Sequence, residues 1–214
     1  DKSLHRYNFG DFYRRSLRLA EALQRTGVAQ GDRVATLMWN HYAHLEAYFG
    51  VPAVGAVLHT LNLRLAPDEI AYIVNHAEDR FILVDDVLLP LFEKFKALIR
   101  PERVIVFSFS GKAVPAEYED YEMFLQTARG EFSYPTIDEN AACGMCYTSG
   151  TTGKPKGVVY SHRSNVLHAF CAAMADSVAL RSTDCVLPVV PMFHANAWAV
   201  PYVAVMAGSK IVFP

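Results

Sequence analysis

The sequence lacks several features that would indicate particular classes of protein. It has 20 basic against 22 acidic residues and no long run of like charge, so nothing in it predicts nucleic acid as a partner. It has no Asn-x-Ser/Thr sequon, and its four cysteines show no disulfide-framework spacing. The first residues also lack the apolar core of a signal peptide. We therefore expect a reducing intracellular setting and a cytoplasmic location.

Residues 185–209 contain no charged residue and are long enough to raise the question of a transmembrane helix. They include Pro188, Pro191 and Pro201, and each proline removes a backbone donor that a spanning helix needs. We expect a buried strand, loop and helix in this stretch, and no transmembrane segment.

Short apolar segments alternate with longer segments of helical spacing along most of the chain. The predicted strands are 33–39, 58–61, 80–85, 103–109, 141–148, 157–162, 185–190 and 210–213. The predicted helices are 10–25, 43–57, 67–77, 87–99, 118–128, 164–176 and one near 198–206. This alternation predicts an α/β fold with a mostly parallel, doubly wound sheet and flanking helices.

The segment 147–157, YTSGTTGKPKG, carries the clearest chemical signal. Its three glycines allow backbone conformations in which several N–H groups point at one anion. Its Ser and Thr hydroxyls can donate to phosphate oxygens or bind a metal ion, and its two lysines add positive charge. Apolar strands are predicted on both sides. The composition therefore predicts a polyphosphate-binding loop between two strands, although a simple surface hairpin has the same residue types.

Two familiar phosphate-binding patterns do not fit this loop. A Walker loop needs a second glycine five residues after its first, followed directly by Lys, but Pro155 follows Gly150 and Val158 follows Gly153 at that spacing. The sequence contains no Gly-x-Gly, which excludes the dinucleotide fingerprint and the kinase glycine-rich loop. Pro155 also prevents a helix from running through the loop.

The same segment, YTSGTTGKPKG, resembles the signature loop of the adenylate-forming superfamily. This superfamily includes acyl-CoA synthetases, luciferases and the adenylation domains of peptide synthetases. The resemblance continues through Val158–His162. It extends upstream to GVPAVGAV at 50–57 with Leu61-Asn62, and downstream to PMFHANAW at 191–198. These landmarks cover nearly the whole chain, and among the subfamilies they most resemble an AMP-forming fatty-acid–CoA ligase.

The resemblance implies a reaction in which ATP and Mg2+ activate a carboxylic acid to an acyl-adenylate, followed by transfer to CoA. It assigns Thr148 to Mg2+, together with a Glu outside this sequence. It assigns the ATP phosphates to Thr148, Ser149, Gly150, Thr151, Thr152, Gly153 and Lys156. Donors and a cation in this place would stabilise the charge that develops on leaving pyrophosphate.

The resemblance also places the acid substrate near His194, Asn196 and Trp198. Enzymes of the superfamily that activate amino acids have an Asp shortly after the Phe of this motif, whereas this sequence has His194. An unpaired ammonium in an apolar pocket would be costly, so an aliphatic acid is favoured. Trp198 resembles the gate of an acyl tunnel. Ordinary core positions for Trp198 and His194 stay open as alternatives.

The sequence has no initiator Met and stops directly after a predicted strand. We expect residues 1–214 to be part of the N-terminal AMP-binding domain, with the rest of that domain and a small C-terminal domain absent. The piece alone would then be inactive. The expected partners are small molecules (fatty acid, ATP and CoA), and the full-length enzyme could be a homodimer. An aryl-CoA ligase, a luciferase-like relative or a non-catalytic nucleotide- or acyl-binding relative remain alternatives.

Two residue pairs invite a metal-site interpretation. Cys143 and Cys146 are three apart on a predicted strand, which places them on opposite faces, so we expect core cysteines. His41 and His44 share a helix face without an evident third ligand, and we expect a solvated or capping pair. No Gly-x-Ser-x-Gly elbow is present for a serine hydrolase.

Overall fold

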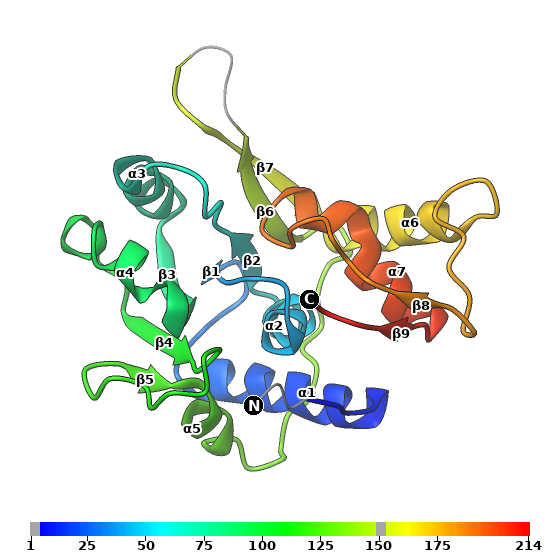
Figure 1. Cartoon of the computed structure of the whole chain (residues 1–214), viewed down its shortest axis with the longest axis horizontal. Helices are drawn as coiled ribbons and strands as arrows, with labels where there is room; N and C mark the ends of the chain where they lie inside the picture. Colours follow the sequence, from blue (N-terminus) through cyan, green and yellow to red (C-terminus); the bar gives the residue numbers. More distant parts are fainter. Residues whose placement is uncertain (1–4, 149–152) are drawn as a thin grey trace.

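The computed structural model describes residues 5–148 and 153–214. Seven strands form one sheet in the order β5-β4-β3-β1-β2-β6-β7, with every neighbouring pair parallel except β6 and β7 (Figure 1). The strands are β1 Arg33–Leu37, β2 Val57–Thr60, β3 Asp79–Asp85, β4 Arg103–Phe107, β5 Glu119–Asp120, β6 Ala142–Thr148 and β7 Lys156–Ser161. Two further short strands, β8 Cys185–Val186 and β9 Lys210–Ile211, pair in parallel with each other.

Helices cover both faces of the sheet, as the alternation predicts. They are α1 Phe9–Arg25, α2 Tyr42–Ala53, α3 Pro67–Ala77, α4 Leu89–Phe92, α5 Tyr121–Gln126, α6 His162–Ala173 and α7 Val200–Ala207, with 3-10 turns η1 Asp86–Leu88, η2 Lys96–Leu98 and η3 Ala195–Ala199. One core joins α1, α2 and α5 to the sheet, and a second joins α3 and α4 to its other face. The doubly wound α/β architecture is confirmed.

Local signals in the sequence explain where several helices begin. Asn8 and Asp11 form a reciprocal capping box at the start of α1, since each side chain accepts from the backbone N–H of the other residue. At α3, Pro67 occupies the first turn and the Glu69 carboxylate accepts from the backbone N–H of Ala66. These signals fix the residues at which the two helices begin.

The structure corrects four predicted elements. The helix predicted at 87–99 is broken into η1, α4 and η2. Pro90 explains the first break, because it lacks the N–H needed to continue a helix from the preceding turn. The helix predicted at 43–57 stops at Ala53, since Gly55 turns the chain with a φ of 81°. The helix predicted at 118–128 is shorter, because Glu119–Asp120 pairs with β4.

The strand predicted at 185–190 is only two residues long. The carbonyl oxygens of Pro188 and Val190 accept hydrogen bonds from the Asn40 side chain rather than from a neighbouring strand. No helix within residues 5–148 and 153–214 has the length and apolarity needed to cross a membrane.

Candidate functional site

The two strands on either side of the predicted phosphate loop, β6 and β7, pair at one edge of the sheet. β6 runs parallel to β2, and β7 returns antiparallel to β6, with Thr148 opposite Lys156 and Tyr147 opposite Gly157. Figure 1 shows this hairpin extending past the other strands beside α3. Thr148 therefore stands at the carboxyl end of a parallel strand, where ligands of open α/β sheets bind. The predicted strand–loop–strand arrangement is confirmed.

The exposed ends of the hairpin suit a charged ligand. The side chains of Thr148, Lys154 and Lys156 are exposed, and Gly153 has a φ of 114° that only glycine adopts without strain. Four other predicted phosphate ligands, Ser149, Gly150, Thr151 and Thr152, lie outside the described residues. The donors present are a hydroxyl and two ammonium groups, which fit a triphosphate.

The same donors fit Mg2+ only as part of a larger set. Thr148 can contribute one oxygen, and no group of three or more acidic, His or Cys side chains gathers to hold a metal ion within residues 5–148 and 153–214. Mg2+ commonly takes one or two protein ligands and completes its shell with substrate phosphates and water. A single hydroxyl at this place is compatible with that mode of binding.

The predicted acyl motif lies against the same strand, β6. The Asn196 amide nitrogen lies 3.6 Å from the position that a Cβ on Gly144 would take. Asn196 is buried, whereas His194 is exposed and Trp198 is 62% exposed. The roles of all three residues toward an acid, and the alternative core positions of His194 and Trp198 in the full-length protein, stay predictions.

The backbone of this motif is strained. Residues 195–199 all have positive φ, between 43° and 64°, although none of them is glycine. Left-handed backbone costs an ordinary residue about 1–2 kcal/mol. Such strain persists only where the surrounding structure holds it, and it is concentrated at functional segments. The geometry thus marks 195–199 as a segment held in place by its neighbours.

Asn40 and Tyr48 hold the segment that leads into this motif. The Asn40 amide donates to the carbonyl oxygens of Pro188 and Val190, both at 2.9 Å, and its Oδ1 accepts from the backbone N–H of Met192 at 2.7 Å. The Tyr48 hydroxyl donates to the carbonyl oxygen of Met192. Sequence reasoning missed both residues. The available signal was a polar residue, Asn40, directly after the predicted buried strand 33–39.

The sequence profile of the AMP-binding enzyme family matches residues 2–214, which is nearly the whole chain. The chain is a member of the AMP-binding enzyme family. It is 52% identical over 212 residues to a long-chain-fatty-acid–CoA ligase from Thermus thermophilus, covering 99% of this chain and 38% of that one. It is 44% identical over 204 residues to a medium-chain-fatty-acid–CoA ligase from Ectopseudomonas oleovorans, covering 94% and 37%. The chain thus spans less than half the length of these relatives.

Solved structures of the family share the fold. A long-chain-fatty-acid–CoA ligase from Archaeoglobus fulgidus superimposes with a TM-score of 0.85 at 23% identity, covering 100% of this chain and 41% of that one. A fatty acyl-CoA synthetase from Mycobacterium tuberculosis gives a TM-score of 0.78 at 26% identity, covering 98% and 39%. The overall fold described above is therefore shared with solved acyl-CoA ligases and synthetases over about 40% of their length.

The His41/His44 pair is not solvated, which corrects the expectation from sequence. His41 Nε2 lies 2.8 Å from Asp85 Oδ1, and its ring stacks on Phe107 at 4.7 Å between centroids. His44 bonds the Thr36 hydroxyl and the Trp39 carbonyl, both at 3.0 Å, and burial lowers its pKa to about 3. Although His41 occupies the N-cap position of α2, its side chain makes no capping bond. Both histidines are structural.

The cysteine pair behaves as predicted. Cys143 and Cys146 are free and buried. Asn165 of α6 donates to the Cys143 thiol at 3.0 Å, and burial raises the pKa of that thiol to about 11. A thiol with a raised pKa is neutral at physiological pH, so neither a reactive nucleophile nor a metal ligand is supported here.

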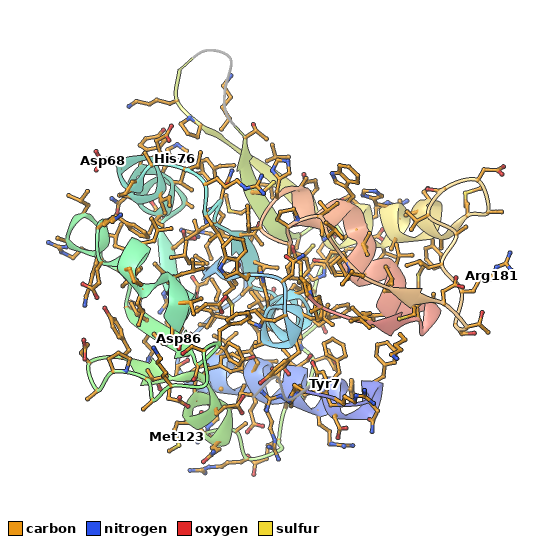
Figure 2. The ribbon with its side chains drawn as sticks, in the orientation of Figure 1. Tyr7, Asp68, His76, Asp86, Met123 and Arg181 are labelled. Carbon is orange, nitrogen blue, oxygen red and sulfur yellow. The ribbon has the colours of Figure 1, made fainter. Side chains whose placement is uncertain are left out.

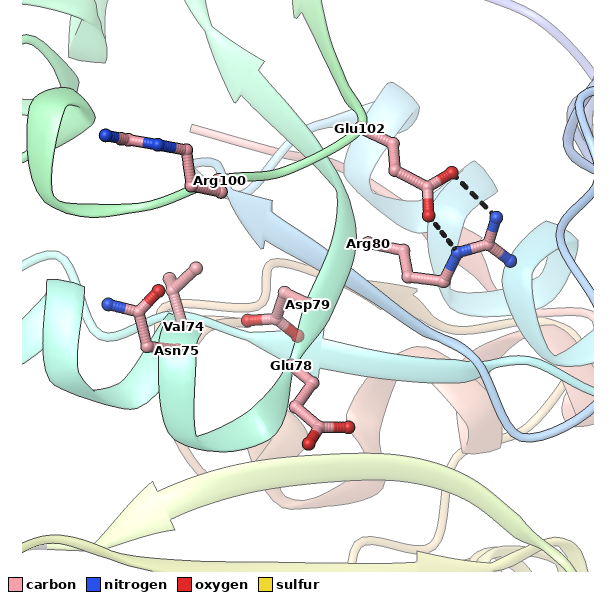
Figure 3. A pocket seen from close by; sticks show the side chains of 7 residues that line it. All are labelled: Val74, Asn75, Glu78, Asp79, Arg80, Arg100 and Glu102. Atoms are coloured by element: carbon pink, nitrogen blue, oxygen red, sulfur yellow. Dashed lines mark hydrogen bonds and ion pairs between the residues drawn. The ribbon is translucent and has the colours of Figure 1, made fainter.

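Two hollows lie away from the phosphate loop. A small one of about 180 Å3 opens at the amino ends of β3 and β4, where Arg80 and Glu102 form an ion pair with Nε–Oε1 at 2.6 Å (Figure 3). A larger apolar one of about 690 Å3 lies between α1, α2, α6 and α7 and is lined by residues such as Phe12, Phe49 and Tyr202. Neither Thr148 nor Trp198 lines either hollow.

Proposed function

We propose that this chain forms the phosphate-loop and acyl-entry part of an AMP-forming fatty-acid–CoA ligase. The full-length enzyme activates a medium- to long-chain fatty acid with ATP to an acyl-adenylate. It then forms acyl-CoA with release of AMP and pyrophosphate. The observation that carries the proposal is the β6–β7 hairpin, which presents Thr148, Lys154 and Lys156 at the carboxyl end of the sheet. The names of the Thermus and Ectopseudomonas relatives support the choice of acid.

The residues that match the family's phosphate loop have definite tasks in this proposal. The Lys156 ammonium pairs with the β- and γ-phosphates and stabilises the charge that develops on pyrophosphate as it leaves. The Thr148 hydroxyl binds Mg2+ or a phosphate oxygen, and Ser149–Thr152 with Gly153 supply further donors. When bound, Mg2+ neutralises the phosphate charge that would otherwise repel the attacking carboxylate.

The acid is proposed to enter past the strained segment 195–199. In this proposal the exposed side chain of Trp198 covers the entrance. The buried side chain of Asn196, in the same segment, lies against Gly144 of β6. His194 stands exposed at the start of the same turn. An Asp in place of His194 would suit an ammonium group, so the uncharged surroundings support an aliphatic acid.

The proposal also assigns functions to sequence outside these 214 residues. The chain spans 38% of the Thermus relative, so the adenine-, ribose- and thiol-handling groups are proposed to lie in the remaining part of the N-terminal domain and in a C-terminal domain. A cytoplasmic location and a homodimeric full-length enzyme stay predictions.

The test is fatty-acid-dependent exchange of pyrophosphate into ATP by the full-length protein. Lys156→Ala should lower kcat/KM for ATP about 10- to 150-fold, because a hydrogen bond to a charged group contributes roughly 1.5–3 kcal/mol. Lys112→Ala, on an exposed loop, is the matched control and should leave exchange unchanged. Unaltered exchange in Lys156→Ala would remove that residue from its role. Preference for aromatic over aliphatic acids of graded length would refute the choice of substrate.

A further inference from the structure

Helix α3 presents two aromatic side chains to the base of the phosphate hairpin. Tyr72 and His76 are one helical turn apart, and their ring centroids lie 5.4 Å apart with an interplanar angle of 33°. Figure 1 places α3 directly beside the hairpin, and Figure 2 labels His76 on the side that faces it. No motif in the sequence marked either residue. Their neighbours on the hairpin are the residues just before and just after the predicted phosphate ligands.

Tyr147, which immediately precedes Thr148, is held on α3 by its hydroxyl. The Tyr147 hydroxyl and His76 Nδ1 are hydrogen-bonded at 2.6 Å, and their rings meet edge to face at 5.8 Å between centroids. Burial raises the pKa of Tyr147 to about 12, so the hydroxyl keeps its proton for this bond at neutral pH. The residue of β6 next to Thr148 is thus tied to a helix on the sheet.

The position of the Tyr147 ring depends on Gly157 across the hairpin. A Cβ on Gly157 would lie only 3.3 Å from Cζ of Tyr147, so the missing side chain leaves room for the ring. On its other side the ring lies 5.3 Å from that of His59, which is buried and paired with Asp79 at 2.8 Å. The final glycine of the loop therefore has a packing task besides any task toward phosphate.

The returning arm of the loop contacts the same helix. Lys154 Nζ lies 5.2 Å from the centroid of the Tyr72 ring, within the range of a cation–π interaction. Tyr147 and Lys154 are on opposite arms of the hairpin, and each contacts a different residue of α3. The residues on both sides of the predicted phosphate ligands therefore contact one helix, α3.

We propose that Tyr72 and His76 of α3, with Tyr147 of β6, form a docking platform that positions the phosphate loop for ATP. This role rests on the proposed function, since it assumes that the loop binds ATP. The platform restricts both arms of the loop before ATP arrives. It thereby reduces the conformational freedom that the loop loses on binding. Tyr72, His76 and Tyr147 are positioning residues, because they act through the loop and not on the reacting atoms.

Trypsin cleavage of the full-length protein without ATP tests the docking directly. Trypsin cuts after Lys and Arg but not before Pro, so the bond between Lys154 and Pro155 is resistant and the bond between Lys156 and Gly157 is the one cut in this part of the hairpin. Because Lys156 is paired in β7, the rate of this cleavage reports opening of the hairpin. Tyr72→Leu removes the aromatic face and should speed this cleavage about two- to five-fold, the effect of losing an exposed cation–π contact. Tyr72→Phe keeps the face and should cleave at the natural rate. Cleavage after exposed Arg181 (labelled in Figure 2) is the internal standard and should not change.

ATP kinetics of the same variants test the positioning role. In Tyr72→Leu and Tyr147→Phe the KM for ATP should rise about two- to five-fold with kcat unchanged, while Tyr72→Phe should retain the natural KM. Equal cleavage rates in Tyr72→Leu and Tyr72→Phe would overturn the platform. Faster cleavage with an unchanged KM for ATP would overturn its role in positioning. If the natural protein used no ATP at all, the proposed function would fail, and the cleavage rates would still decide whether the loop docks on α3.

Discussion

Replacing Asn40 by alanine should destabilise the protein far more than its position in a turn suggests. Asn40 is 8% exposed and makes three hydrogen bonds to the backbone of Pro188, Val190 and Met192. A buried hydrogen bond contributes about 1 kcal/mol net, and leaving its partner unsatisfied costs about 1–3 kcal/mol. Some of the freed groups will find water. We therefore expect Asn40→Ala to lower the free energy of unfolding by roughly 2–4 kcal/mol, a large part of the 5–15 kcal/mol typical of a domain.

Urea unfolding followed by tryptophan fluorescence is a suitable assay, because the two tryptophans lie on either side of this contact. Trp39 directly precedes Asn40, and Trp198 follows the segment that Asn40 holds. Asn75→Ala is the control, since Asn75 is exposed and its side chain makes a single bond, to the carbonyl oxygen of Leu98 at 2.9 Å. That variant should lose no more than about 1 kcal/mol.

Asn40→Asp sharpens the test. The carboxylate can still accept from Met192, but its second oxygen faces the carbonyl oxygens of Pro188 and Val190, where a donor is needed. It should therefore be at least as unstable as the alanine variant. In the full-length protein the alanine change should also raise KM for the acid more than KM for ATP. An unfolding free energy within about 0.5 kcal/mol of the natural protein would refute the reasoning.

Two further changes test the packing beneath the site. Burial lowers the pKa of His44 to about 3, so below pH 6.5 the unfolded chain binds a proton that the folded chain does not. The free energy of unfolding should fall by about 2 kcal/mol between pH 6.5 and pH 5, and His44→Gln should remove this pH dependence. Urea unfolding at each pH measures it, and the same pH dependence in the natural protein and in His44→Gln would contradict the assignment. Gly50→Ala should lower the free energy of unfolding by about 1–3 kcal/mol in the same assay, because the added Cβ would lie 2.8 Å from the Ser16 carbonyl oxygen. A variant more stable than the natural protein would disprove this close approach of α1 and α2.

Much of the fold follows from local signals in the sequence. The helix at 67–77 is predicted to the residue, because Pro67 and Glu69 fix its start and no packing contact overrides them. The strand–loop–strand form of the phosphate hairpin follows from Pro155, which rules out a helix. Where a signal inside an element was overlooked, the prediction fails, as for Pro90 within 87–99.

The rest depends on contacts between residues far apart in the chain. Asn40 is hydrogen-bonded to Pro188, Val190 and Met192, which follow it in the chain by 148, 150 and 152 positions. No periodicity or spacing in the sequence encodes contacts over such separations. The burial of His41 and His44 depends likewise on partners from β1 and β3. The positive φ values of 195–199 could not be predicted either, because four of these five residues are alanine or tryptophan, which rarely adopt left-handed backbone.

The pairing of β6 with both a near and a distant strand has a consequence for how the protein folds. β7 follows β6 after a short loop, and isolated hairpins form in about 1–10 μs. The partner of β6 on its other side, β2, lies more than eighty residues earlier, and closing so long a loop is entropically slow. We expect the β6–β7 hairpin to exist transiently as a free ribbon during folding. During that time the exposed Val158 and Val159 would be available to other unfolded chains, and Lys156 at its end would oppose such association by charge.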